Sequence, residues 1–227
     1  MTGFAEVRPT RRSRSGSLRV MNFMEPVDES ARLAREIELE LVARLRTSDS
    51  DAFDVVHAAY NGRLFNFLAR LSRRREVAED LLEETWLRVV DKAPQLRPDT
   101  RLGPFLFTVA RNLYISYCRS RSLEDSLGAD MIGLWPLGTP RPSPFDATVA
   151  KETGQHVDLA LAALPALYRE ALLLVAFDDM RPAEAALVCG ITPEAMRQRL
   201  SRARAMLTKK VEELQTSRVT ALKEATT

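Results

Sequence analysis

Polar side chains that can bind DNA gather on one side of a segment near the C-terminal end of the chain. At 3.6 residues per turn, Arg197, Gln198, Ser201 and Arg202 fall on the same side of a helix over residues 193–207. Arginine and glutamine can pair with base edges in the major groove, and arginine and serine can hold phosphates. The candidate DNA contacts in this segment are Thr192, Glu194, Arg197, Gln198, Arg199, Ser201, Arg202 and Arg204.

The residues around this segment predict a helix-turn-helix. Gly190 can take the left-handed backbone that ends a preceding helix. Thr192 can cap the next helix, and Pro193 suits its first turn. A recognition helix also needs an apolar back that packs on its own domain. That back consists of Met196, Leu200, Ala203 and Leu207.

Two plainer interpretations of the same residues stay open. A basic amphipathic helix is often only a solvated face, and a helix pair with glycine in its turn also forms antiparallel hairpins in bundles. Arg199 and Arg204 stand at the flanks of the outer face, where they would hold phosphate. Arg199 could instead form an ion pair within its own domain.

The bulk composition excludes several classes of protein. The chain has 227 residues, 45% of them hydrophobic, and a net charge of only +2, so any nucleic-acid surface must come from local segregation of charge. Its two cysteines and two histidines follow no metal-ligand or disulfide spacing, which predicts no metal, no cofactor and free thiols in a reducing cytoplasm. No apolar run approaches the ~20 residues of a membrane span, and the N-terminus lacks the apolar core of a secretory signal.

Helical periodicity runs through the chain, and no segment shows the alternation of a strand. We therefore expect an all-α protein with two small helical domains joined by a flexible linker, the C-terminal one containing the helix-turn-helix. The expected segments are a disordered basic extension over 1–28, a helical domain over 29–121, a Pro- and Gly-rich acidic linker over 122–150, a second helical domain over 151–214 and a frayed tail over 215–227.

Apolar stripes predict where the helices and the cores lie. The first domain should hold helices over 30–46, after the caps at 48–50, over 77–93 and over 104–121. In the first of these, the apolar residues Leu33, Ile37, Leu41 and Leu45 recur every four residues and form one helical stripe. The core of the second domain should be supplied by Leu159, Leu161, Leu164, Leu167, Leu172 and Val175.

Five segments in this order resemble those of a bacterial extracytoplasmic-function sigma factor. The resemblance covers about Leu39 to Val211, apart from the linker. The segments are LVARLRTSDSDAF from Leu41, AEDLLEETWLRV from Ala78, FLFTVARNLYISYCRSR from Phe105, ALPALYREALLLVAFDDM from Ala163, and LSRARAML from Leu200.

The resemblance implies a non-enzymatic subunit that binds core RNA polymerase, recognises the −10 and −35 elements of promoters and assists their melting. Its implied partners are the coiled coil of the largest polymerase subunit, promoter DNA and an anti-sigma factor, without membrane insertion of its own. Two other functions stay open: a stand-alone helix-turn-helix regulator, and an all-helical enzyme or scaffold. The segment at 192–204 would read the −35 element.

The helix over 78–93 matches the family's polymerase-docking surface, and its acidic side would otherwise be a solvated face. An acidic rim with apolar neighbours suits such a partner. Trp86 is expected in the core. The implied core-polymerase contacts are Glu79, Asp80, Leu81, Glu83, Glu84, Leu87 and Arg88.

The helix over 105–121 and the loop before it match the family's −10 region. Aromatic residues interleaved with arginines suit a single strand whose bases stack on side chains. In the plainer interpretation Leu113 and Tyr117 are core residues and the arginines are only surface. The implied −10 contacts are Arg97, Asp99, Thr100, Arg101, Arg111, Asn112, Tyr114, Tyr117, Arg119 and Arg121.

Overall fold

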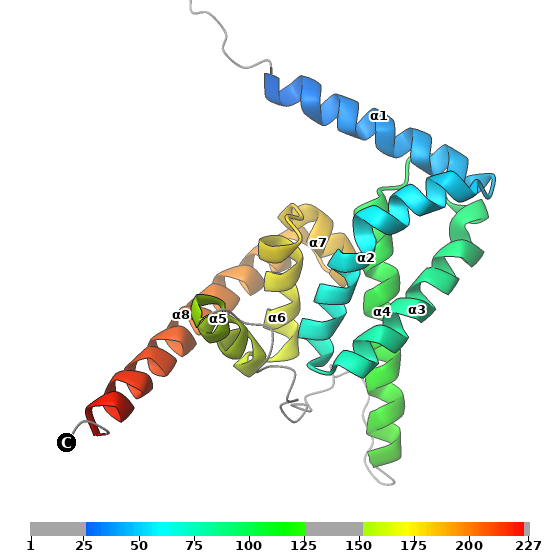
Figure 1. The fold of residues 1–227 in the computed structure, drawn as a ribbon. Coiled ribbons are helices and arrows are strands. Elements are labelled where there is room, and N and C mark those ends of the chain that lie inside the picture. Colours follow the sequence, from blue (N-terminus) through cyan, green and yellow to red (C-terminus); the bar gives the residue numbers. More distant parts are fainter. Residues whose placement is uncertain (1–25, 126–151, 225–227) are drawn as a thin grey trace, which may run out of the picture. The chain divides into compact units, whose positions relative to one another are not determined.

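The computed structural model describes residues 26–125 and 152–224, and this part of the chain forms helices without a strand (Figure 1). The predicted all-α class is therefore confirmed. Residues 1–25, 126–151 and 225–227 lie outside the described part. They include almost all of the expected basic extension and most of the expected linker. The chain divides into one unit of Met1–Glu36 and another of Ile37–Thr227.

Helix α1 (Pro26–Arg46) crosses the boundary between these units. In the second unit, Val42 and Leu45 are buried. Leu33 and Ile37 belong to the same apolar stripe, but their side chains are 58% and 51% exposed. Periodicity shows only that residues share a face, and the cover for that face has to come from other elements.

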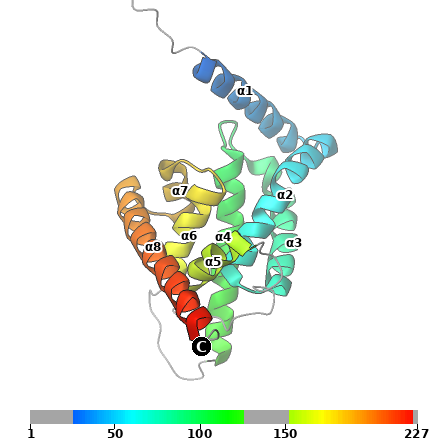
Figure 2. The ribbon, with the colours of Figure 1, turned by 60° about the vertical axis from the view of Figure 1, so that its left-hand side comes forward.

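The first domain is built on three helices that pack against one another (Figure 2). Asp49 starts the first of them, because its carboxylate accepts hydrogen bonds from the backbone N–H groups of Asp51 and Ala52. The helix ends where Arg73 takes a left-handed backbone with a φ of 58°. The elements are α2 (Ser50–Ser72), α3 (Arg75–Lys92), a 3₁₀ turn (Ala93–Gln95) and α4 (Leu102–Asp125).

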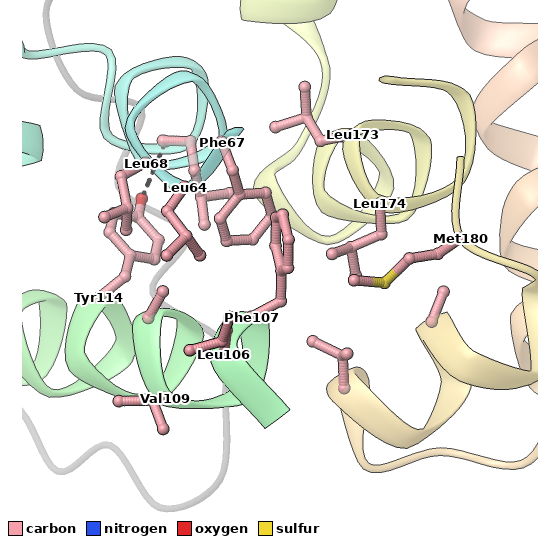
Figure 3. Close-up of a cluster of buried hydrophobic side chains, with 14 of the residues drawn as sticks. Leu64, Phe67, Leu68, Leu106, Phe107, Val109, Tyr114, Leu173, Leu174 and Met180 are labelled. Carbon is pink, nitrogen blue, oxygen red and sulfur yellow. Dashed lines mark hydrogen bonds between the residues drawn. The ribbon is translucent and has the colours of Figure 1, made fainter. Parts of the chain in front are cut away.

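Aromatic and leucine side chains fill the space between α2 and α4 (Figure 3). The rings of Phe67 and Phe107 meet edge to face with 5.2 Å between their centroids. Leu64, Leu68 and Leu106 are fully buried around them. Each such side chain contributes about 1.5–3 kcal/mol by leaving water, so this cluster fixes α4 on α2.

The second domain contains four helices and one wide turn. The wide turn is a π-helical stretch, which accommodates an extra residue within a helix. Helix α8 packs along α5, α6 and α7. The elements are α5 (Glu152–Ala163), α6 (Ala166–Leu172), the π turn (Leu173–Phe177), α7 (Pro182–Cys189) and α8 (Pro193–Glu224).

Helix α8 extends past the expected end of this domain, and one expected core residue is exposed. Helix α8 continues to Glu224, beyond residue 215, from which fraying was expected. The segment after Pro193 contains neither glycine nor another proline to stop the helix. Leu159 is 45% exposed, although it was expected in the core. The neighbouring Leu161 and Leu164 are buried as expected.

The helix-turn-helix forms as the sequence predicts. Gly190 takes a φ of 65°, the left-handed conformation that ends α7. The hydroxyl of Thr192 accepts a hydrogen bond of 3.2 Å from the backbone N–H of Ala195 and so caps α8. Ile191 packs against the core between the two helices.

The two domains share one apolar core within the second unit. Leu173, Leu174 and Met180 of the second domain approach Phe107 of the first (Figure 3). Helix α4 packs against α7, and α2 packs against α6 and the π turn. This arrangement brings the predicted −10 helix against the predicted −35 domain.

Candidate nucleic-acid interface

Helix α8 separates an apolar back from a polar front. Met196, Leu200 and Ala203 are at most 3% exposed and anchor the helix on its own domain. The front is accessible to a ligand, because the side chains predicted to read bases point to solvent. The exposed residues on this front are Thr192, Glu194, Arg197, Gln198, Ser201, Arg202 and Arg204.

Two of the front residues pair with each other. Arg197 donates to the Glu194 carboxylate at 2.7 Å, and both side chains are more than 60% exposed. The backbone N–H of Glu194 and the cation of Arg197 lower the pKa of Glu194. Water screens an exposed pair of this kind and leaves it weak, so a phosphate or a base can replace the carboxylate.

Arg199 lies apart from this front. Its side chain is only 15% exposed, and its Nη1 lies 3.9 Å from Oε2 of Glu170 in α6. The sequence left an ion pair within the domain open as an alternative to a phosphate contact, and this is the arrangement found. Neither Nη1 of Arg199 nor Oε2 of Glu170 has a hydrogen-bond partner.

The same glutamate binds Arg111 of the predicted −10 helix. Arg111 Nε donates to Oε1 of Glu170 at 2.5 Å across the interface between the domains. The Glu170 side chain is fully buried, and burial raises its pKa against the opposing effect of Arg111. Arg111 was expected to face DNA, but in this structure it faces the second domain.

Tyr114 is not placed as a base-stacking residue. Its ring is 5% exposed, and its hydroxyl donates to the carbonyl of Leu71 at 3.2 Å. Burial raises the pKa of this phenol. Some of the aromatic and arginine residues of α4 therefore belong to the core and others to the surface. The sequence pattern alone did not show which residues belong to which group.

The remaining predicted residues of α4 lie nearer the surface. Asn112, Arg119 and Arg121 are exposed, and Tyr117 is half-buried. The hydroxyl of Tyr117 accepts hydrogen bonds from Arg121 at 3.1 Å and from Arg74 at 3.4 Å. Asn112, Arg119 and Arg121 could reach a nucleic-acid strand without a rearrangement of the core.

The loop before α4 is held by its own polar residues. Arg97 pairs with Asp99 at 3.2 Å, and the hydroxyl of Thr100 donates to the carbonyl of Arg97 at 2.7 Å. Arg101 binds Glu38 at 3.2 Å and lies 3.6 Å from Glu184 of α7. The loop thus presents Arg97 and Asp99 to solvent, while Arg101 faces carboxylates.

The predicted polymerase-docking face of α3 borders an apolar groove of about 430 Å³. Leu87 is 57% exposed at the groove, whereas Leu81 is 8% exposed and belongs to the core. Glu79 and Glu83 line the groove. The other predicted contacts on this helix are Asp80, Glu84 and Arg88, and Arg88 binds Glu84 at 2.8 Å. The groove is lined by Phe53, His57, Asn61, Glu79, Leu82, Glu83, Trp86, Leu87 and Val90.

Trp86 forms the floor of this groove rather than its rim. It is 8% exposed, and its indole N–H donates to Asn61 at 2.9 Å. The ring of Phe53 meets the indole edge to face with 5.6 Å between the ring centroids, and the ring centroid of His57 lies 4.7 Å from that of Trp86. The expected core position of Trp86 is confirmed, and the aromatic cluster gives the groove a rigid apolar base.

The sequence pattern did not reveal a set of charged residues between the domains. Arg169 is 2% exposed and donates to carbonyls of both domains. Arg63 of α2 donates to the backbone carbonyl of Asp178 at 2.7 Å and to its carboxylate at 3.4 Å. A signal existed for Arg169 and Glu170, because they stand in the otherwise apolar run ALYREALLLVAF.

The described residues form neither a candidate metal site nor a membrane-spanning helix. Residues 26–125 and 152–224 contain no group of three or more His, Cys, Asp or Glu side chains that could hold a metal ion. No helix in the same part of the chain is long and apolar enough to cross a membrane.

Two family models match the chain, one in each domain. The model described as sigma-70 region 2 matches residues 56–124, which run from α2 through α4. The model described as sigma-70 region 4 matches residues 155–207, which include the helix-turn-helix.

The chain aligns with curated sigma factors over most of the length of those proteins. The ECF RNA polymerase sigma factor SigM of Bacillus subtilis is 31% identical over 156 residues, which are 68% of this chain and 91% of that protein. The RNA polymerase sigma factor CarQ of Myxococcus xanthus is 31% identical over 70% of this chain and 88% of its own.

Two solved structures have a similar fold. CnrH in complex with the cytosolic domain of CnrY aligns with a TM-score of 0.58 and 20% identity, over 78% of this chain and 97% of CnrH. The sigma factor RpoE in complex with the anti-sigma factor NepR, from Bartonella quintana, aligns with a TM-score of 0.57 and 26% identity, over 70% of this chain and 96% of RpoE. The order of its two matched regions and its similarity to these curated sigma factors over about two thirds of its length show that the chain belongs to the extracytoplasmic-function family of RNA polymerase sigma factors.

Proposed function

We propose that the chain, as a sigma factor that directs RNA polymerase in transcription initiation, reads the −35 element with the front of α8. The observation that carries this proposal is the division of α8 into a buried back and an exposed front of arginine, glutamine and serine. Arg197, Gln198 and Arg202 would contact base edges and phosphates, and Thr192, Ser201 and Arg204 would contact phosphates at the edge of the groove. Arg199 would join them only after leaving Glu170.

The −10 element would bind at α4 and its preceding loop. Asn112, Arg119 and Arg121 offer hydrogen bonds and positive charge to a separated strand. In the loop, Arg97, Asp99 and Thr100 form a polar rim that can hold an unstacked base. Unstacking costs a few kcal/mol per base, which contacts of this kind offset.

Core polymerase would dock on α3. Glu79, Glu83 and Leu87 combine negative charge with apolar area at the groove, a combination that suits a basic amphipathic helix of a partner. Such a partner would insert an apolar side chain above Trp86 and place cations near the glutamates. Leu81 would support this surface from below.

We further propose that the chain acts by binding and catalyses no reaction, since the chemistry of initiation belongs to the polymerase that it directs. It would work where the polymerase works, in the cytoplasm. An anti-sigma factor would be a further partner, because RpoE, which has a similar fold, is bound to the anti-sigma factor NepR. A stand-alone helix-turn-helix regulator is not favoured, because it would leave the region 2 match at 56–124 without a role.

Reconstituted transcription tests the role of α8. With core polymerase, the chain should start transcription from a subset of genomic fragments. Arg202→Ala should lower this output about tenfold, since one good base contact corresponds to about 1–3 kcal/mol. Arg46→Ala removes another exposed arginine, in α1, and should change little. Equal losses in both variants would count against reading of DNA by α8.

A further inference from the structure

We propose that Glu38 of α1 is a positioning residue for promoter melting, because it holds the loop over residues 96–101 at the start of α4. The inference rests on the proposed function of this loop, which is to hold an unstacked base of the −10 element. Glu38 would not touch DNA itself. It would act through Arg101 and Leu102, the two residues at which the loop passes into α4.

The first support is that one carboxylate makes both contacts. Oε1 of Glu38 accepts a hydrogen bond from the backbone N–H of Leu102 at 2.7 Å, and Oε2 accepts one from Nη1 of Arg101 at 3.2 Å. Because the two oxygens belong to one planar group, the pair of bonds fixes the direction of the chain at this point as well as its place. A helix that lies 64 residues away in the sequence therefore holds the end of the loop.

The second support is that the start of α4 needs an acceptor from another element. The first N–H groups of a helix have no carbonyl partner within the helix. The carbonyl of Arg101 accepts the first helical bond, from the N–H of Phe105 at 3.1 Å, so Arg101 occupies the capping position. Its guanidinium has no acceptor atom and cannot cap the helix. Glu38 supplies the missing oxygen, and its negative charge suits the positive end of the helix dipole.

The third support is that the loop has buried ends and an exposed middle. Leu96 and Leu102 are buried, whereas the side chain of Arg97 points to solvent. Within the loop, the backbone N–H of Thr100 donates to the carbonyl of Arg97 at 3.0 Å and closes a turn. The loop thus has a compact shape of its own, and its place on the domain depends on how its ends are held. Glu38 holds the end next to α4.

Loss of Glu38 should displace the loop in a definite direction. Besides Glu38, the carboxylate of Glu184 in α7 lies 3.6 Å from Nη2 of Arg101. Without Glu38, Arg101 would keep this second carboxylate, and the N–H of Leu102 would lose its acceptor. The end of the loop would then move toward α7. Side chains of a binding site have to be held within about 0.5 Å, so a small displacement is enough to lose an unstacked base.

Two substitutions of Glu38 grade the loss, and a neighbouring acid provides the control. Glu38→Ala removes both contacts. Glu38→Gln keeps an oxygen for the N–H of Leu102, but it turns an amide N–H₂ toward the guanidinium of Arg101, so it should lose part of the effect. Glu40→Ala removes an exposed carboxylate of the same helix and should change little. Circular dichroism of each full-length variant shows whether it folds.

Binding of a −10 strand with single abasic sites tests the inference in the reconstituted holoenzyme. The probe is a single-stranded oligonucleotide from a promoter found in the transcription assay, with one base at a time removed. In the wild type and Glu40→Ala, the base held by the loop should cost about tenfold in affinity when it is removed. Asp99→Ala identifies this position, because it alters the exposed rim of the loop itself. In Glu38→Ala the cost should fall to less than twofold at this position alone, and in Glu38→Gln to about threefold. Affinity for a −35 duplex should stay unchanged.

The outcomes separate the role of Glu38 from the proposed function of the loop. A mere loss of stability would weaken binding at every position alike, whereas a positioning role couples Glu38 to one base. A position that depends on Asp99 and keeps its full cost in Glu38→Ala would overturn the inference alone. If the alanine variant does not fold, the same result in Glu38→Gln overturns it. Absence of any position that depends on Asp99 would refute the proposed function of the loop, and the inference with it.

Discussion

The guanidinium of Arg169 in α6 donates to the carbonyl of Leu71 at the end of α2 across 3.2 Å, although 98 residues separate them in the chain. The same carbonyl accepts the hydroxyl of Tyr114 in α4. Three helices from the two domains thus meet at one backbone oxygen. Arg169 also donates to the carbonyls of Leu161 at 2.9 Å and Leu164 at 2.8 Å, so it joins the turn after α5 to the first domain.

Replacement of Arg169 should therefore destabilise the chain. We expect Arg169→Met to lower the free energy of unfolding by about 3 kcal/mol, because several buried carbonyls lose their donor at about 1–3 kcal/mol each. Arg169→Lys should recover little, since an ammonium lacks the planar fork that reaches them all. Urea unfolding measures both effects, and a loss below that of the exposed control Arg46→Met would contradict the assignment.

The carboxyl of Asp178 should make stability depend on pH. Burial raises its pKa from 3.8 to about 6, against the opposing effect of Arg63. Between these values the folded chain holds a proton that the unfolded chain has lost, so this group stabilises the fold at lower pH. From pH 5 to pH 7, the free energy of unfolding should fall by about 1 kcal/mol more in the wild type than in Asp178→Asn.

Urea unfolding of both proteins at the two pH values measures this difference. The charged neighbours that act on Asp178 are Arg63, Arg70 and Asp179, and none of them changes in the variant. Parallel pH dependences in the wild type and Asp178→Asn would show that another group is responsible.

The groove on α3 should determine affinity for core polymerase. Leu87→Ser removes exposed apolar area without touching the core, and we expect about tenfold weaker binding of core, since loss of a leucine contact at an interface costs about 1–2 kcal/mol. Asp80→Ala/Glu84→Ala should also weaken capture, more at low salt than at high salt. Glu40→Ala/Asp51→Ala removes two exposed acids elsewhere and serves as the matched control in a pull-down titration. Unchanged capture by both Leu87→Ser and Asp80→Ala/Glu84→Ala would remove this face of α3 from the docking site.

The two thiols should differ in reactivity. Burial raises the pKa of Cys189 to about 12, beside the carboxylate of Glu170, and Cys118 is partly exposed. At pH 8 only about one Cys189 side chain in ten thousand would be a thiolate. Iodoacetamide should modify Cys118 first and Cys189 only after denaturation, as mass spectrometry can follow. Rapid labelling of Cys189 in the folded chain would contradict its burial next to Glu170.

The local structure of the helix-turn-helix could be predicted because each step depends on a residue type at a fixed place. Gly190 supplies the left-handed backbone, Thr192 supplies the cap, and Met196 begins the buried stripe. These features are set within a few residues of one another. Asp49 at the start of α2 is a similar case.

The sequence was less informative wherever distant segments decide the outcome. Tyr114 and Arg111 fit the pattern of a strand-binding helix, yet the first is covered by α2 and the second by Glu170. Leu33 lies on an apolar helical stripe but is exposed. A period of 3.6 assigns residues to a face, and it does not say which other element covers that face.

The π turn before Asp178 sets the direction in which the Asp178 side chain points, and so affects its contact with Arg63. A helix rotates successive side chains by about 100°, and the extra residue accommodated within Leu173–Phe177 shifts that phase for the residues after the turn. The contact between Asp178 and Arg63 therefore depends on the number of residues in the turn as well as on their opposite charges. Deletion of a single residue from the turn would swing the acid away from its arginine, so an insertion or deletion there can couple or uncouple the two halves of the molecule in one evolutionary step.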